Sequence, residues 1–219
     1  MSKTAETLVA VLSGIGATLG IRSGTEEPRY TVVEQMGAVE IRHYGPRLAA
    51  EATVPGDAVA ARNAGFRALA GYIFGGNTAR SSIAMTAPVA QTAARSPIAA
   101  RSQTIAMTAP VAQEPAAGPD GPWRVQFFMP ARYTRETLPT PNDPNVRIVE
   151  APAQDYAVLR FSGARDAKAV DARTADLQRV LAASRWRPAG PAGAWFYDPP
   201  WTVPFLRRNE VITPVRPAA

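Results

Sequence analysis

Apolar and polar side chains alternate along much of this 219-residue chain, and a period of two predicts short β-strands. In the segment 39–44, for example, Val39, Ile41 and His43 share one face, and the residues between them share the other. The turn-forming pair Gly45-Pro46 ends this run. The predicted strands are Tyr30 to Met36, Val39 to Tyr44, Arg47 to Val54, Trp123 to Met129, Val146 to Glu150, Asp155 to Phe161, Ala194 to Tyr197 and Val211 to Val215.

The segment Ile-Ala-Met-Thr-Ala-Pro-Val-Ala-Gln occurs twice, from Ile83 to Gln91 and again, letter for letter, from Ile105 to Gln113. A single duplication does not indicate a solenoid, which needs several stacked units. In each copy Ile, Met, Ala and Val occupy alternate positions, which predicts two strands joined as a long hairpin. Because proline cannot donate to a β-ladder, Pro88 and Pro110 are expected at strand ends or on a sheet edge.

Two longer segments have the period of an α-helix instead. The first helix is predicted from Ala58 to Phe74 with Asp57 as its N-cap, and the second from Asp166 to Ser184. Arg62 lies four residues before Phe66, so the apolar face of the first helix carries a positive charge. The residues expected on the apolar faces are Val59, Phe66, Leu69, Ala70 and Ile73 in the first helix, and Val170, Thr174, Leu177 and Leu181 in the second.

The order of these elements predicts an α+β fold, with two helices against a largely antiparallel sheet. Each half of the chain, at roughly 30–112 and 146–215, has a strand pair, a helix and further strands, and the Trp123 strand bridges the halves. We therefore expect an internal repeat within a single domain over residues 27–219, preceded by an apolar segment over residues 1–26. Two helices leave part of the sheet uncovered, so a cleft between helix and sheet is expected, which suits binding better than catalysis.

The composition is that of an ordinary globular protein, with 46% hydrophobic and 19% charged residues. The 21 prolines favour short elements separated by turns. A net charge of +6 suggests acidic partners. The basic residues are scattered, however, with no run longer than Arg207-Arg208, so a nucleic-acid surface is not supported.

The apolar segment from Leu8 to Ile21 is open to three interpretations. It is shorter than the roughly 20 residues that a membrane-spanning helix needs. It also lacks a strongly basic leader and a clear A-x-A cleavage site. It is therefore a helix that docks on the domain, an anchor for peripheral membrane contact, or a weak signal sequence. A cytoplasmic protein is the first expectation, with membrane association or export as alternatives, and the oligomeric state stays open.

The absence of cysteine and the single histidine, His43, limit the possible chemistry. Disulfides, thiol nucleophiles and metal sites built from cysteine or several histidines are excluded. The acidic residues are spread singly and no phosphate-binding glycine motif occurs, so a binding protein is expected rather than an enzyme. His43 is the one side chain that offers a nitrogen to a haem iron or a magnesium porphyrin. The alternative is a histidine at a sheet edge that binds water or backbone.

Several other side chains are candidates for a ligand-binding cleft. Arg62 and Arg67 on the first helix could pair with carboxylates of an amphipathic ligand, or they could belong to a solvated helix flank. Arg207 and Arg208 are most simply explained as ion-pair partners of Glu210 or of a nearby carboxylate. The apolar candidates, which could line the cleft or belong to the core, are Phe66, Leu69, Trp201 and Phe205.

Many segments together resemble the SOUL haem-binding proteins, in the order of that family and over nearly all of residues 27–215. One such segment would be weak evidence, whereas the ordered series is specific. The doubled methionine motif and the N-terminal apolar segment depart from the family pattern. The matching segments are VEIRHYGP (39–46), YIFGGN (72–77), both IAMTAPV motifs, FFMP (127–130), the proline-rich run that begins with Leu138-Pro139, FSG (161–163), YDPP (197–200) and RNEV (208–211).

This resemblance implies a distorted β-barrel with two flanking helices and a pseudo-two-fold repeat, similar to the effector-binding domains of multidrug-responsive regulators. It implies reversible, non-covalent binding of haem or a related tetrapyrrole in a hydrophobic groove beside the first helix, as a carrier or buffer. In some relatives a histidine at the position of His43 has been proposed as axial ligand, and others bind haem without a protein ligand. By position, the implied groove residues are Arg62, Phe66, Leu69 and the loop from Trp201 to Phe205.

Two other functions stay open. The domain could be a small-molecule effector or protein-interaction module that binds haem only incidentally, although no DNA-binding helix pair is predicted beside it. It could also be an enzyme that processes tetrapyrroles, for which an acid/base pair beside the groove would be the distinguishing feature. The sequence shows no obvious pair of this kind.

Overall fold

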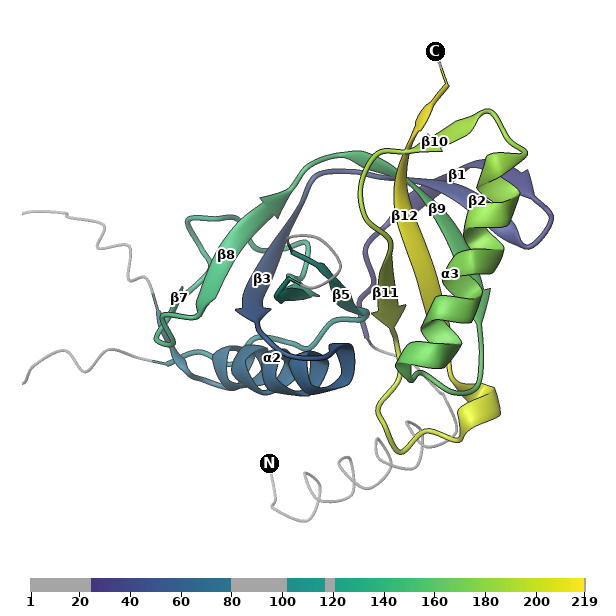
Figure 1. Ribbon diagram of the computed structural model, residues 1–219. Coiled ribbons are helices and arrows are strands. Elements are labelled where there is room, and N and C mark those ends of the chain that lie inside the picture. Colours follow the sequence, from purple (N-terminus) through teal and green to yellow (C-terminus); the bar gives the residue numbers. More distant parts are fainter. Residues whose placement is uncertain (1–24, 80–101, 117–120, 219) are drawn as a thin grey trace, which may run out of the picture.

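The computed structural model describes residues 25–79, 102–116 and 121–218, and in these ranges it contains two α-helices and a large sheet (Figure 1). The predicted α+β fold class is confirmed. Each predicted strand outside the repeated motif is present, and so are both helices. The elements are β1 (Tyr30–Met36), β2 (Val39–Tyr44), β3 (Arg47–Val54), α2 (Ala58–Ile73), β4 (Asn77–Thr78), β5 (Val111–Pro115), β6 (Trp123–Phe128), β7 (Thr140–Pro141), β8 (Val146–Ala151), β9 (Gln154–Phe161), α3 (Ala167–Ala182), β10 (Trp186–Pro188), β11 (Gly193–Phe196), the 3-10 helix η1 (Pro204–Leu206) and β12 (Asn209–Pro217).

The strand order of the main antiparallel sheet is symmetric about the pairing of β11 with β5. Outward from this pair, one side continues with β12, β9 and β2, and the other with β6, β3 and β8. The unit β3-α2-β5-β6 therefore corresponds to β9-α3-β11-β12, which confirms the predicted internal repeat. The prediction that the Trp123 strand merely bridges the halves is wrong, because β6 pairs with both β3 and β5 and completes the first half.

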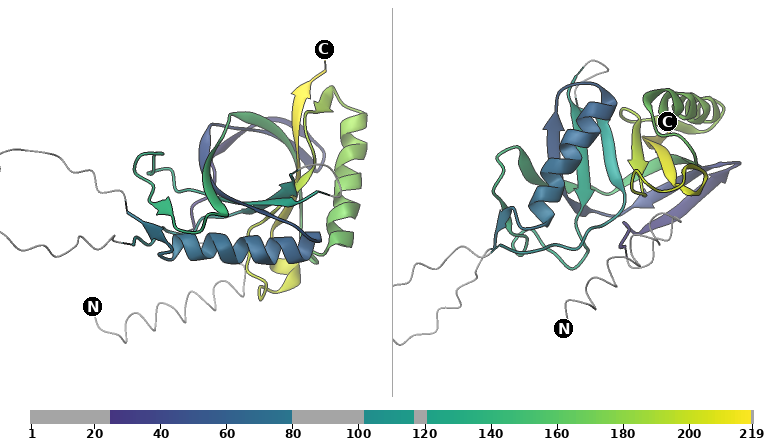
Figure 2. Two further views of the ribbon diagram at one scale, coloured as in Figure 1. Left: turned by 60° about the vertical axis from the view of Figure 1, so that its left-hand side comes forward. Right: turned by 90° about the horizontal axis from the view of Figure 1, so that it is seen from below.

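The sheet curls into a half-barrel, and each half carries its helix on the outer surface (Figure 2). Helix α2 covers a buried cluster from β3, β6 and β8, and α3 covers a second cluster from β2, β9 and β12. A third cluster, rich in aromatic rings, lines the inner surface of the curl. Its largest members are Tyr44, Phe128, Trp195 and Tyr197.

The two halves meet closely where β5 pairs with β11. Gly193 lies so near β5 that a Cβ atom on it would come 2.7 Å from the carbonyl oxygen of Gln113. That distance is far below van der Waals contact, and the obstructing atom is backbone, so a side chain here would force the strands apart. A glycine at position 193 is therefore required for the halves to pair in this register.

Helix α2 begins at its predicted N-cap, because the Asp57 side chain accepts hydrogen bonds from two backbone N–H groups of the first turn. The predicted apolar face is only partly right, since Val59 and Phe66 are each 37% exposed. Small residues take their place because the helix packs tightly on β6, where a Cβ atom at Gly65 would lie 2.6 Å from the Val125 side chain. The buried residues of α2 are Ala61, Gly65, Leu69, Tyr72 and Ile73.

The second copy of the repeated motif does not form the predicted strand over its whole length. Ile105 packs in the cluster beneath α2 and donates its N–H to the carbonyl of Ile73 at 2.8 Å. Met107, expected on the same face, is 41% exposed. The ladder begins only at Val111, after Pro110, which has no N–H to donate. The first copy lies outside the described residues, so the hairpin stays a prediction.

The buried carboxylate of Glu210, on β12, binds side chains from β2 and from the loop that precedes β12. The Glu210 side chain has no exposed surface and lies 3.1 Å from Arg42 and 3.0 Å from Arg208. It also accepts a hydrogen bond from the Tyr197 hydroxyl at 2.7 Å. The predicted pairing of Arg208 with Glu210 is thus confirmed, whereas Arg207 donates to backbone carbonyls instead. Two arginines share this one carboxylate, and each also has a second partner, because Arg42 lies 2.6 Å from Glu40 and Arg208 lies 2.9 Å from Glu27.

The described helices do not include one that is long and apolar enough to cross a membrane. The segment from Leu8 to Ile21 lies outside the described residues. Its three interpretations therefore stay predictions.

Replacing Gly65 by alanine is expected to destabilise the fold by about 1–3 kcal/mol, because the new methyl group overlaps Val125. Urea unfolding followed by circular dichroism measures this change. Gly71→Ala is the matched control, since it lies in the same helix and its Cβ would have nothing within 4 Å. The control should be neutral or stabilising by up to about 1 kcal/mol. Equal effects of the two changes would contradict the close packing of α2 on β6.

Glu210→Gln is expected to cost about 1.5–3 kcal/mol of stability, because it removes the fully buried negative charge that accepts hydrogen bonds from Arg42, Arg208 and Tyr197. The same denaturation experiment measures it. Glu150→Gln serves as the control, because the Glu150 side chain is 68% exposed and its 3.6 Å pair with Arg135 lies at the surface. Its effect should stay below about 0.5 kcal/mol. A small loss of stability in Glu210→Gln would mean that Glu40 and Glu27 are sufficient partners for the two arginines.

Candidate functional site

Arg62, on α2, contacts the last residue of β11 and the segment just before α3. Its guanidinium carbon lies 4.6 Å above the centre of the Phe196 ring, and its Nη1 donates to the carbonyl of Arg165 at 3.2 Å. Burial lowers the pKa of Arg62. Among the described residues Arg62 has no ion pair with a carboxylate. A positive charge is therefore held at this junction without a counter-charge.

Two further arginines lie near Arg62, around the loop that follows β11. Arg165 donates to the carbonyl of Asp198 at 3.2 Å. Burial, followed by the positive charges of Arg62 and Arg207, lowers the pKa of Arg165 to about 10, although Asp198 opposes the shift. Arg207 donates to two backbone carbonyls of the loop, both at 2.8 Å. The three guanidinium groups repel one another, and a bound anion would relieve that repulsion.

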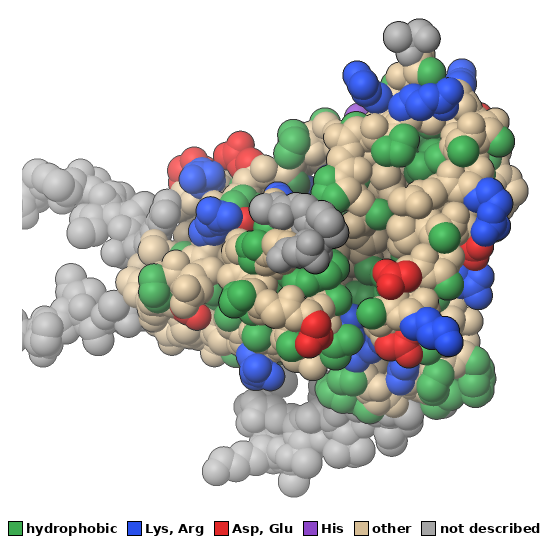
Figure 3. Space-filling model, viewed as in Figure 1, with side chains coloured by type: hydrophobic (Ala, Val, Ile, Leu, Met, Phe, Trp, Pro, Cys, Tyr) green, Lys and Arg blue, Asp and Glu red, His purple; other side chains and the backbone are tan. Residues whose placement is uncertain are grey.

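Apolar and basic side chains lie together at the lower right of the space-filling view, where the loop after β11 and η1 lie (Figure 3). Trp201 is 64% exposed and Phe205 is 74% exposed, both in the loop between β11 and β12. Phe66, one turn after Arg62, is 37% exposed and packs edge-on against Phe127 with ring centres 5.4 Å apart. We call this region the α2–loop surface. It comprises Arg62, Phe66, Arg165, Trp201, Phe205 and Arg207.

Leu69 does not belong to this surface. It is 0% exposed and lies in the cluster beneath α2, one turn beyond Phe66. A ligand could reach it only if α2 moved away from the sheet. Its part in the structure is to hold α2 in place.

His43 lies at the end of β2, with 48% of its side chain exposed and its Nδ1 2.6 Å from the Asp155 carboxylate. Metal-ligating histidines commonly have such a carboxylate partner. However, His43 pairs across the sheet with Asp155 on β9. Phe196, which Arg62 contacts, lies in the row of Phe161, six residues further along β9. At the rise of a β-strand this is about 20 Å. The structure does not bring His43 to the α2–loop surface.

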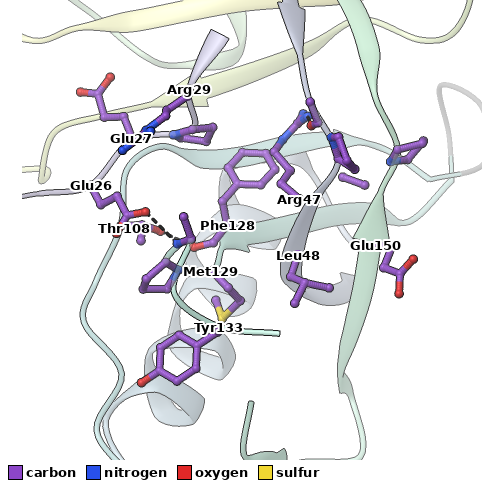
Figure 4. A pocket seen from close by; sticks show the side chains of 17 residues that line it. Glu26, Glu27, Arg29, Arg47, Leu48, Thr108, Phe128, Met129, Tyr133 and Glu150 are labelled. Carbon is purple, nitrogen blue, oxygen red and sulfur yellow. Dashed lines mark hydrogen bonds between the residues drawn. The ribbon is translucent and has the colours of Figure 1, made fainter. Parts of the chain in front are cut away.

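A second candidate site is a cavity between the start of β3 and the end of β6 (Figure 4). It has a volume of about 810 Å³, and we call it the outer cavity. Its walls come from residues 26–29, the link between β2 and β3, the turn after β6 and the turn between β8 and β9. None of the six predicted binding residues lines it.

A smaller cavity of about 350 Å³ adjoins it along the inner surface of the curl and shares Arg47 and Phe128 with it. Three glutamates line it, and one of them, Glu51, has a side chain that is 5% exposed and accepts hydrogen bonds from Arg147 at 2.7 Å and Gln126 at 2.8 Å. Polar groups in this inner cavity therefore largely satisfy one another.

The structure places Arg47 between the two cavities, and no local pattern in the sequence marks it. It is the first residue of β3, where the period of two suggests only a strand. Its inward direction depends on rings that come from β2, β6, β9 and β11. A side chain placed in this way has no signal in the sequence before the strand order is known.

Comparison with known proteins assigns the chain to a family. The sequence model of the SOUL heme-binding protein family matches residues 25–102 and 98–214, which together are most of the chain. The chain belongs to the SOUL heme-binding protein family. The resemblance found in the sequence motifs is thereby confirmed. No curated protein matches the sequence.

Solved structures share the fold of this SOUL-family chain. The crystal structure of the EcmrR C-terminal domain superposes with a TM-score of 0.52 at 10% sequence identity, over 86% of this chain and 99% of that one. EcmrR in the cryo-EM structure of its DNA complex gives a TM-score of 0.52 at 11% identity, over 99% of this chain and 68% of that one. At such low identity these likenesses establish the fold alone.

The SOUL-family chain thus presents two separate places for a ligand. The α2–loop surface contains four of the six predicted binding residues, namely Arg62, Phe66, Trp201 and Phe205. The outer cavity contains none of them, because its walls come from turns and strand ends that have no common sequence pattern.

Proposed function

We propose that this SOUL-family chain binds haem or a related tetrapyrrole non-covalently on the α2–loop surface, and that it acts as a carrier or buffer. The observation that carries the proposal is the combination, on one surface, of exposed aromatic rings with three clustered arginines. A tetrapyrrole has the complementary features, since it joins two flat apolar faces to carboxylate side chains.

The apolar part of the ligand would supply most of the affinity. Trp201 and Phe205 could cover the macrocycle from the loop, and Phe66 could support it from α2. Burial of several hundred Å² at about 25 cal/mol per Å² gives several kcal/mol before the entropic cost of association. The exposed aromatic rings are therefore the main binding groups in this proposal.

The arginines would orient the ligand through its carboxylates. A propionate that approaches Arg62, Arg165 or Arg207 gains charge-assisted hydrogen bonds. Arg165 has the most to gain, because burial and its two positive neighbours hold its pKa at about 10. A bound carboxylate would raise this pKa again, so the ligand and the full charge of Arg165 would stabilise each other.

The iron of a haem bound here would have no histidine ligand. His43, the single histidine of the chain, lies about 20 Å away by the rise of β9. Ligation by His43 would instead require a site at the end of β2. One face of a macrocycle on the α2–loop surface would remain open to solvent, so haem could exchange without unfolding of the domain. That openness favours a carrier or buffer.

The outer cavity favours a second candidate function, that of a small-molecule effector module. Its volume of about 810 Å³ falls within the range of roughly 300–1,000 Å³ that is typical of small-molecule sites. Haem binding would then be incidental to the activity of the domain.

Titration of the tag-free protein with haemin, followed at the Soret band, should show saturable one-to-one binding. The double variant Trp201→Ala/Phe205→Ala should bind about tenfold to a hundredfold more weakly, because two large apolar contacts of roughly 1–2 kcal/mol each are lost. Both side chains are mostly exposed, so the fold should be unaffected. His43→Ala should leave both the spectrum and the affinity unchanged.

Phe74→Ala is the matched control for the double variant. Phe74 is 62% exposed but caps the far end of α2, so its removal should not change haemin affinity. A changed Soret band in His43→Ala, with no effect of the double variant, would move the site to β2. If haemin binding does not saturate above the level of a non-specific control protein, the haem proposal is wrong and the effector module is favoured.

A further inference from the structure

The side chain of Arg47 occupies a box of aromatic rings between the two cavities. Its guanidinium carbon lies 4.7 Å from the ring centre of Phe128 and 4.9 Å from that of Tyr44. Tyr156 and Trp195 complete the box at 5.8 and 5.9 Å. Stacking on several rings fixes the plane of the guanidinium and leaves its edges for hydrogen bonds.

The charge of Arg47 is poorly compensated. Its Nη1 donates to the carbonyl of Gly45 at 3.2 Å, whereas its buried Nε has no hydrogen-bond partner. No carboxylate of a described residue forms an ion pair with it. Burial lowers the pKa of Arg47, and favourable interactions with Tyr156, Tyr44 and Glu114 offset this loss only in part. A partly buried cation with a buried, unpartnered Nε favours an anionic partner.

Carboxylates near the outer cavity do not supply that partner, because they are engaged elsewhere. Glu27 pairs with Arg208 at 2.9 Å, and Glu150 pairs with Arg135 at 3.6 Å. Glu26 accepts a hydrogen bond from the backbone N–H of Ala131 at 2.7 Å (Figure 4). The deep end of the cavity is therefore positive.

The remaining walls of the outer cavity are mainly apolar. Leu48 and Met129 lie on it together with the ring of Phe128 (Figure 4), and prolines from several turns line its rim. Such walls suit a hydrocarbon or aryl body, while the arginine at the inner end suits an acidic head group. The cavity walls are therefore apolar toward the rim and positively charged at Arg47.

We propose that the outer cavity binds an amphipathic carboxylate, with its head group on the Arg47 guanidinium and its apolar body against Leu48, Met129 and Phe128. This site is separate from the α2–loop surface and does not depend on haem binding. An amphipathic cation is excluded, because the position that aromatic rings would offer it is already filled by Arg47. Two ligands with the same alkyl chain and opposite head-group charges should therefore differ in affinity for the outer cavity.

Isothermal titration calorimetry with sodium decanoate and with decyltrimethylammonium, both below their micellar concentrations, tests the proposal on the full chain. Decanoate should bind with one-to-one stoichiometry, and the cation should bind at least tenfold more weakly. Arg47→Met should weaken decanoate binding about tenfold to a hundredfold, because a charge-assisted hydrogen bond is lost while an apolar side chain keeps the box filled. Circular dichroism checks that the variant is folded.

Ala131→Trp provides a second test that does not alter the core. Ala131 is an exposed residue on the cavity wall, so a large ring there should obstruct decanoate and leave haemin affinity unchanged. The variant Trp201→Ala/Phe205→Ala should show the reverse, with normal decanoate binding. The proposal is overturned if decanoate does not bind, if Ala131→Trp binds it normally, or if the cation binds equally well. Loss of decanoate binding in the double variant would also overturn it.

Discussion

The pairing of β5 with β11 is the constraint on which the rest of the structure depends. It joins Val111–Gln113 to Ala194–Phe196, and the missing side chain of Gly193 permits the approach. Because each half carries its helix on the outside, this seam forms a half-barrel whose inner surface is enclosed but not filled. The same seam places Phe196 beside α2, so that Arg62 can stack on its ring. Both candidate ligand sites follow from this arrangement.

Charge pairing explains why the two sites favour anions. The buried carboxylates Glu51 and Glu210 are each bound by arginines, and the net charge of +6 means that some basic side chains remain without carboxylate partners. Arg62 and Arg47 are two of these basic residues in the described part of the chain, and both lie next to aromatic rings. Cation–π contacts hold the guanidinium groups in place at modest energetic gain, and a bound carboxylate would add the missing counter-charge.

Most of the secondary structure could be predicted because it depends on local patterns. Period-two alternation placed the strands, and Asp57 marked the start of α2 as its N-cap. The strand predicted for residues 105–113 was wrong over its first part, because Ile105 packs under α2 before the ladder begins. The apolar face expected for α2 was only partly right at Phe66, which is 37% exposed because α2 approaches β6 through Gly65.

The sequence by itself determined the element types, the α+β class and the family, because propensity, capping and motif order are properties of neighbouring residues. The family resemblance also implied Arg62, Phe66, Trp201 and Phe205 as binding residues, and this stays a prediction. Only the tertiary structure decided that His43 lies on another part of the sheet and that Arg47 enters an aromatic box. The rings around Arg47 come from strands as far apart as β2 and β11, and the distance from His43 to Arg62 depends on their rows in the sheet. Such relations arise from strand order and curl, which no local pattern encodes.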